Sequence, residues 1–211
     1  MTTGGPMTAY DAPTRLDRAD TIGMYATVCI AAVAVAATIW GVIARLAEVV
    51  PLRDVPVLVP FIDEVADLPI GPDGAPVTVA VDQAVVTVPE PAAATGFALI
   101  AEPLVHGLAI VAGVVMLALL CWNVARGRAF SRANVRIVFS GVGVLAAGWL
   151  FGTILTNMTV NGALSAVSDY TYEGITFSTD WAIPFAILAL GLVGAAFQVG
   201  ARLQRDTDGL V

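Results

Sequence analysis

The stretch Arg126-Gly127-Arg128-Ala129-Phe130-Ser131-Arg132-Ala133-Asn134 is a short basic turn with a long apolar run on either side. The flanking runs, 96-125 and 135-167, carry almost no charge, and each exceeds the roughly 20 residues that a helix needs to cross a membrane. Two further apolar runs, at 21-50 and 181-201, are also long enough. The sequence therefore predicts four transmembrane helices, with the basic turn joining the second to the third.

The composition of the whole chain agrees with this prediction. Of the 211 residues, 58% are hydrophobic and 13% are charged, which is too apolar for a soluble protein of this length. The net charge of -7 is the total over loops that lie on two sides of a membrane, so it does not identify a partner. No feature of the sequence indicates that the protein binds nucleic acid. With two cysteines and one histidine, the sequence offers no disulfide framework and no metal or haem cluster. Phosphate-binding loops and hydrolase motifs are also missing from the sequence, so we expect no cofactor, no metal and no enzymatic activity.

We predict an all-α membrane protein, a four-helix bundle with a partly β extracytoplasmic loop between its first two helices. The predicted segments are a flexible tail (1-20), helix 1 (21-50), an acidic loop (51-95), helix 2 (96-125), the basic turn (126-134), helix 3 (135-167), a short loop (168-180), helix 4 (181-201) and a second tail (202-211).

The 51-95 loop differs from the rest of the chain in composition. It is rich in proline and holds seven acidic residues against one arginine. Val77, Val79 and Val81 alternate with smaller residues, a pattern typical of a strand. We expect Asp82-Gln83 to turn this strand into a second one at 84-88. A lone hairpin is marginally stable in water, so it should pack on the helix ends or on a partner.

The arginines predict the orientation, because the chain contains no lysine. Eight of the ten lie in or beside the N-terminal tail, the basic turn and the C-terminal tail, whereas only Arg45 and Arg53 follow the first span. Cytoplasmic segments carry the excess of basic residues in membrane proteins. We therefore expect both termini in the cytoplasm and the loops 51-95 and 168-180 outside.

Polar residues in the outer half of the predicted bundle form a candidate site. Glu102 and His106 are one helical turn apart, and Thr153, Asn157 and Asn161 repeat at four-residue spacing in the third span. If the two faces meet, they line a small pocket for protons, cations or a solute. Hydrogen bonds between helices explain the same pattern without a ligand, so both interpretations stay open.

The basic turn is a second candidate, with Arg126, Arg128, Arg132 and Arg136 available to bind anionic lipid or a regulatory protein. Their role as determinants of orientation needs no partner and is the alternative. Locally, Gly127 is placed to end the second helix and Ser131 to cap the third. Gly148-x-x-x-Gly152 offers a small surface for helix packing, either within the chain or between copies of a homo-oligomer.

Three segments carry a resemblance to a family: Gly127-Arg128-Ala129-Phe130-Ser131-Arg132-Ala133-Asn134, Phe197-Gln198-Val199-Gly200, and the ending Leu203-Gln204-Arg205-Asp206-Thr207-Asp208-Gly209-Leu210-Val211. The chain resembles a family of bacterial four-span membrane proteins of unknown function. Its members share a Gly-x-x-Phe-Ser-x-x-Asn turn between spans two and three and a charged tail that often ends in Gly, Leu, Val. The resemblance implies the bacterial plasma membrane, hints at signalling or regulation, and brings no catalytic residues.

From these observations we expect a non-enzymatic regulatory or accessory membrane component, with membrane lipid and a protein partner or a second copy of the chain as its contacts. The alternative is a small transporter or channel subunit that uses the outer polar residues. The inner halves of the spans are almost purely apolar, which favours the first expectation.

Overall fold

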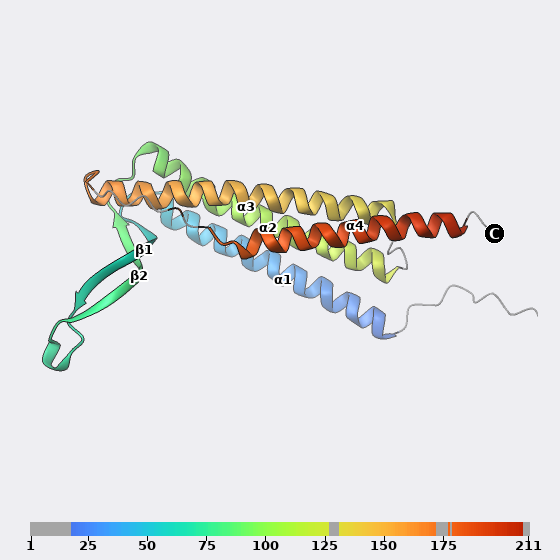
Figure 1. Cartoon of the computed structure of the whole chain (residues 1–211), viewed down its shortest axis with the longest axis horizontal. Helices are drawn as coiled ribbons and strands as arrows, with labels where there is room; N and C mark the ends of the chain where they lie inside the picture. Colours follow the sequence, from blue (N-terminus) through green and yellow to red (C-terminus); the bar gives the residue numbers. More distant parts are fainter. Residues whose placement is uncertain (1–17, 127–130, 172–176, 178, 209–211) are drawn as a thin grey trace, which may run out of the picture.

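The computed structural model describes residues 18–126, 131–171, 177 and 179–208. Within them the chain forms four long helices and one two-stranded sheet (Figure 1). In chain order these are α1 (Arg18–Val49), β1 (Val55–Leu68), a short 3-10 turn η1 (Pro72–Gly74), β2 (Val77–Val88), α2 (Ala93–Ala125), α3 (Arg132–Val167) and α4 (Ala182–Asp208). The predicted combination of four long apolar helices with a small sheet between the first two is confirmed.

The helices lie side by side, and the hairpin of β1 and β2 projects from one end of the bundle (Figure 1). The beginning of α1, the end of α2, the beginning of α3 and the end of α4 all lie toward the other end (Figure 1). α3 is central, since it packs against α2 along its length and against α4 along its first half. α4 continues to Asp208, beyond the apolar run that ends near residue 201.

The outward surface of the bundle is apolar. Trp40 of α1 is 73% exposed and Leu192 of α4 is 74% exposed, and large aliphatic side chains on α2 and α3 also face outward. Each helix contains a stretch long and apolar enough to cross a membrane: Tyr25–Val49, Ala93–Ala125, Arg132–Val167 and Ala182–Leu203. An exposed apolar area of this extent is unusual for a monomeric soluble protein.

Small residues let α2 and α3 approach closely. A Cβ atom at Gly148 would overlap the Ala109 Cβ, and one at Gly162 would overlap the Thr95 side chain. Farther along the same face, a Cβ at Gly141 would lie 3.1 Å from the sulfur of Met116. Glycine at these positions therefore permits close packing of two antiparallel helices, as in other small-residue helix interfaces.

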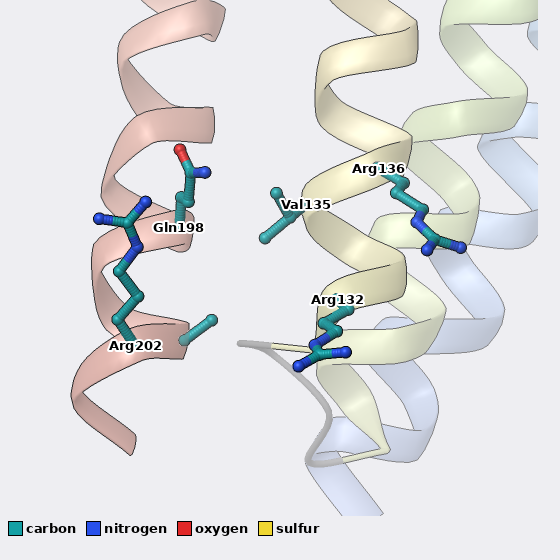
Figure 2. A pocket seen from close by; sticks show the side chains of 6 residues that line it. Arg132, Val135, Arg136, Gln198 and Arg202 are labelled. Carbon is teal, nitrogen blue, oxygen red and sulfur yellow. The ribbon is translucent and has the colours of Figure 1, made fainter. Parts of the chain in front are cut away.

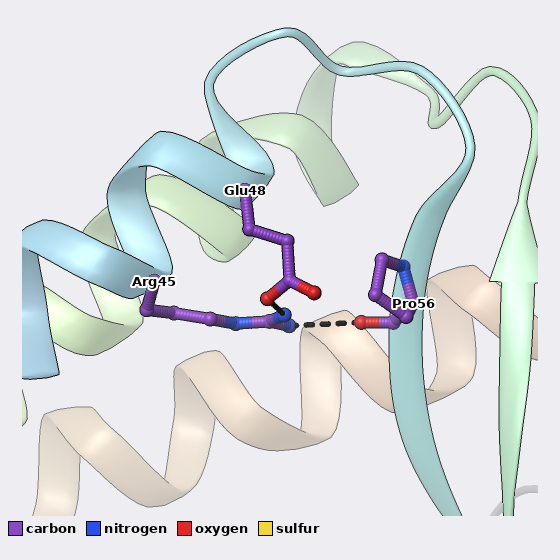
Figure 3. A network of polar contacts seen from close by, with 3 residues as sticks. All are labelled: Arg45, Glu48 and Pro56. Carbon is purple, nitrogen blue, oxygen red and sulfur yellow. Dashed lines mark hydrogen bonds and ion pairs between the residues drawn. The ribbon is translucent and has the colours of Figure 1, made fainter.

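The hydrophobic core lies where the base of the hairpin meets the helix ends. Its buried residues come from five elements: Val49, Val55, Val57, Val59, Val88, Leu99, Val160, Ala163 and Leu164. Arg45 reinforces this junction, because its guanidinium pairs with Glu48 at 2.5 Å and donates to the Pro56 carbonyl of β1 at 3.0 Å (Figure 3). The hairpin is thus anchored to α1 through both apolar and polar contacts.

The structure confirms a small sheet in the predicted loop, but the hairpin predicted between the segments 77–81 and 84–88 is wrong, and so is its turn at Asp82-Gln83, because all of these residues belong to the single strand β2. β2 pairs antiparallel with β1 from Val55↔Val88 to Leu68↔Val77. The turn lies instead between the two strands and contains η1, where Gly74 has a positive φ of 78°. The prolines in β1 argued against a strand when only the sequence was considered. In a two-stranded sheet, however, every strand has a free edge, and proline is tolerated there.

Candidate functional site

The predicted polar residues of α2, Glu102 and His106, lie at the contact between α2 and α3. Thr156 Oγ1 donates a hydrogen bond of 2.7 Å to Glu102 Oε1, and both residues are half-buried. The antiparallel α2–α3 register that aligns Ala109 with Gly148 also sets Glu102 opposite Thr156. Glu102 is therefore bonded across the interface, to a threonine that lies beside the predicted stripe and not in it.

His106 lies one turn farther along α2, over Gly152 of α3. A Cβ at Gly152 would overlap the imidazole, and Nε2 is the closest ring atom. Gly152 precedes Thr156 by one turn, so Glu102 and His106 contact consecutive turns of α3. No hydrogen bond to the imidazole occurs among the residues that the structure describes. His106 thus packs on Gly152, although the residue as a whole is exposed.

The predicted stripe of Thr153, Asn157 and Asn161 lies on a face of α3 next to the face that carries Thr156. Asn157 Nδ2 donates to the Thr153 carbonyl at 2.7 Å, and Asn161 Nδ2 donates to the Asn157 carbonyl at 2.9 Å. Since successive helical residues are about 100° apart, Asn157 points roughly a quarter-turn away from Thr156. The structure brings Glu102, His106 and Thr156 together and places the stripe beside them, so a shared ligand pocket stays a prediction.

The basic turn is described only in part, because Arg128 lies outside the described residues. Arg126 at the end of α2 stacks on the Trp122 ring, with 4.3 Å from its guanidinium carbon to the ring centroid. The predicted cap is confirmed: Ser131 Oγ accepts from the Asn134 amide at 3.3 Å. The side chain of Asn134 is fully buried, and Asn123 Nδ2 of α2 donates to its Oδ1 at 2.7 Å.

Arg132 and Arg136 line a pocket of about 270 Å³ between α3 and α4, at the end of the bundle away from the hairpin (Figure 2). The other lining residues are Val135, Gln198, Ala201 and Arg202. We name this the basic pocket. Sequence reasoning missed the contribution of α4. The signal was present, since the orientation argument placed Arg202 on the same side of the membrane as the basic turn.

The outer half of the hairpin is the third region with a distinct surface. A β-bulge between Pro60 and Glu64 shifts the register of β1, and an open hollow of about 830 Å³ lies there. Apolar residues such as Phe61, Val65 and Val79 line the hollow together with Glu64 and Asp82. Past the bulge β1 has no fully buried residue, in contrast to its base.

No group of three or more histidine, cysteine, aspartate or glutamate side chains suited to a metal occurs within the described part of the chain. No protein-family model, curated protein or solved structure matches the chain. The resemblance to four-span bacterial proteins therefore stays a prediction that rests on the quoted residues.

Proposed function

We propose that this chain is a non-enzymatic accessory or regulatory component of the bacterial plasma membrane, and that its hairpin is the docking surface for a protein partner. The observation that carries the proposal is the exposed outer half of the hairpin, which stands clear of the helices (Figure 1). Ile62 and Val65 of this part are 72% and 66% exposed. Val65 also lines the open hollow beside the bulge, together with Phe61 and Val79. An exposed apolar patch is typical of an interaction site.

The membrane part of the proposal rests on the outward apolar surface of all four helices. In a bilayer these side chains face lipid, and the helices satisfy their own backbone hydrogen bonds. The positive-inside rule orients the bundle with both termini in the cytoplasm and the hairpin outside. The hairpin, which contains exposed carboxylates, is then in water, where a protein partner has access to it.

Charge indicates the chemistry of the partner. Beyond the base of the hairpin the exposed acids are Asp63, Glu64, Asp67, Asp73 and Asp82, and neither arginine nor lysine lies between 54 and 125. A partner surface that combines apolar and basic side chains complements this region. A second copy of the chain would place carboxylates against carboxylates, so we favour a different protein.

The strand edges indicate how such a partner binds. Pro56 and Pro60 remove two backbone donors from β1, whereas β2 contains no proline. A free strand edge offers unpaired N–H and C=O groups that an extended segment can pair with. β2, which keeps all of its backbone donors, is therefore the better edge for an added strand, and the hollow beside the bulge accommodates its side chains.

A photo-crosslinking experiment in native membranes tests this function. A benzoylphenylalanine at Val65 should give one adduct of defined mass with another protein, and the same group at Leu192, exposed on α4, should not. The charge reversals Glu64→Lys and Asp82→Lys should abolish the adduct, whereas Glu90→Lys, near the base of the hairpin, should preserve it. Adducts only with the chain itself, or identical adducts from both positions, would contradict the proposal.

The alternative function, proton or cation handling by Glu102 and His106, makes a different prediction. The hydrogen bond from Thr156 to Glu102 gives this carboxylate a structural role in helix packing. Purified protein in proteoliposomes should therefore show no flux above the background of protein-free vesicles. Flux that Glu102→Gln or His106→Gln removes would replace the accessory function with transport.

A further inference from the structure

The basic pocket differs from the rest of the bundle surface in its charge. Three of its six lining residues are arginines and none is acidic. α3 contains no acidic residue from Arg132 to Val167. Within the described part of the chain, no carboxylate pairs with these arginines. The pocket is therefore a concentration of positive charge with no counterion from its own walls.

The geometry of the pocket suits a small anion. Val135 of α3 is directed toward α4, and Gln198 lies on the side of α4 that faces it (Figure 2). The Arg202 side chain extends along α4, Arg132 lies at the beginning of α3, and the guanidinium of Arg136 is directed away from α4 (Figure 2). Arginine offers forked donors that match phosphate oxygens, and the glutamine amide adds two further donors. The volume of about 270 Å³ lies just below the ~300–1,000 Å³ of pockets that hold drug-sized ligands.

The depth of the pocket along the bundle also matters. Arg132 is the first residue of α3, and Arg202 follows directly after the apolar run of α4 that ends near residue 201. Given the proposed membrane insertion, both arginines lie where hydrocarbon gives way to headgroups. Val135 and Ala201 are the apolar residues of the lining. The beginning of α3 adds the positive end of a helix dipole.

We propose that the basic pocket binds a phosphate group, with the headgroup of an anionic phospholipid as its source. Arg132 and Arg202 hold the phosphate from two helices, Gln198 donates a hydrogen bond, and Arg136 adds long-range attraction. Since α4 contacts the bundle through α3, the bound lipid bridges the ends of these two helices. Basic pockets between membrane helices are known to recognise headgroups in this way. This inference needs membrane insertion but not the proposed partner of the hairpin.

Native mass spectrometry of the full chain in detergent tests the site, with phosphatidylglycerol and phosphatidylcholine of identical acyl chains as probes. Each arginine near the membrane surface strengthens binding to an anionic lipid about fivefold. The wild-type protein should therefore bind one phosphatidylglycerol at least about tenfold more tightly than phosphatidylcholine. Arg132→Gln and Arg202→Gln should each weaken binding about fivefold, and the double variant about 25-fold. Both side chains are exposed, so the variants should fold, which circular dichroism verifies.

The matched control is Arg126→Gln, which removes the same charge at the same end of the bundle but outside the pocket lining. It should leave the preference for phosphatidylglycerol intact; an equal loss in this variant would show nonspecific attraction and overturn the site. A second arm measures thermal stabilisation by inorganic phosphate against chloride. If inorganic phosphate stabilises the wild-type protein but not Arg132→Gln, and the wild type shows no preference for phosphatidylglycerol, then a soluble phosphate is the source. Absence of both effects overturns the proposal.

Discussion

The Thr156 hydroxyl of α3 donates a hydrogen bond of 2.7 Å to the Glu102 carboxylate of α2, at the point where small residues bring the two helices together. One turn away, the His106 ring lies on Gly152. The same interface thus combines a polar bond with close packing. Its contribution to stability is measurable without knowledge of any ligand.

A double-mutant cycle isolates the bond between Glu102 and Thr156. Thr156→Val should lower the free energy of unfolding by about 0.6–1.7 kcal/mol in the wild-type chain, the range found for hydrogen bonds between membrane helices. In a Glu102→Leu background the same substitution should cost almost nothing, because the acceptor is already gone. Unfolding in mixed micelles measures all four proteins. Equal costs in both backgrounds would show that the two side chains are not coupled.

Close packing of α2 on α3 predicts opposite effects for two glycine substitutions in α3. Gly148→Ala puts a methyl group into the Ala109 Cβ, which cannot move without its backbone, so it should destabilise the protein by about 1–3 kcal/mol. Gly143→Ala meets no atom within 4 Å, and alanine favours helix over glycine, so this variant should be as stable as wild type or more stable. Thermal unfolding in detergent compares the two. Equal effects would contradict the observed helix contact.

The contact between Arg45 and the base of the hairpin predicts local loosening on substitution. Arg45→Gln removes the Glu48 ion pair and the bond to the Pro56 carbonyl, which together contribute about 1 kcal/mol at a partly exposed site. Hydrogen exchange should accelerate at the start of β1 and remain unchanged in α3. Arg53→Gln, an exposed arginine nearby, should leave exchange unaltered. Uniform acceleration through all helices would show a global effect instead.

The sequence predicted those parts of the fold that depend on local composition. Helix lengths follow from apolar runs, and Ser131 was recognisable as a cap because a hydroxyl just before a helix can accept from its first turn. The extent of β1 was hidden, because Pro56 and Pro60 argue against a strand unless one knows that the sheet has only two. Knowledge of the pairing partner was the missing information.

For the candidate sites too, the sequence indicated single residues but not the partners that they contact. Glu102 and His106 were recognisable as polar residues in an apolar helix, but Thr156 became the partner of Glu102 only through the antiparallel register of α2 and α3. Likewise Arg132 and Arg202 are distant in sequence, and only the packing of α4 on α3 brings them to one pocket. Contacts between helices depend on side-chain shapes along both, which composition does not encode.

The cap at Ser131 gives a last prediction, which concerns the start of α3 and thereby one wall of the basic pocket. Ser131→Ala leaves the Asn134 amide without its side-chain acceptor and should destabilise the protein by about 1 kcal/mol. Ser131→Thr retains a hydroxyl acceptor and should restore most of that loss, whereas Ser140→Ala, at an exposed position within α3, should cost little. Urea or heat unfolding ranks the three variants. If Ser131→Ala and Ser131→Thr prove equally stable, the hydroxyl contributes nothing to the helix, and the start of α3 must be held by its packing on α2, where Asn123 bonds the buried Asn134.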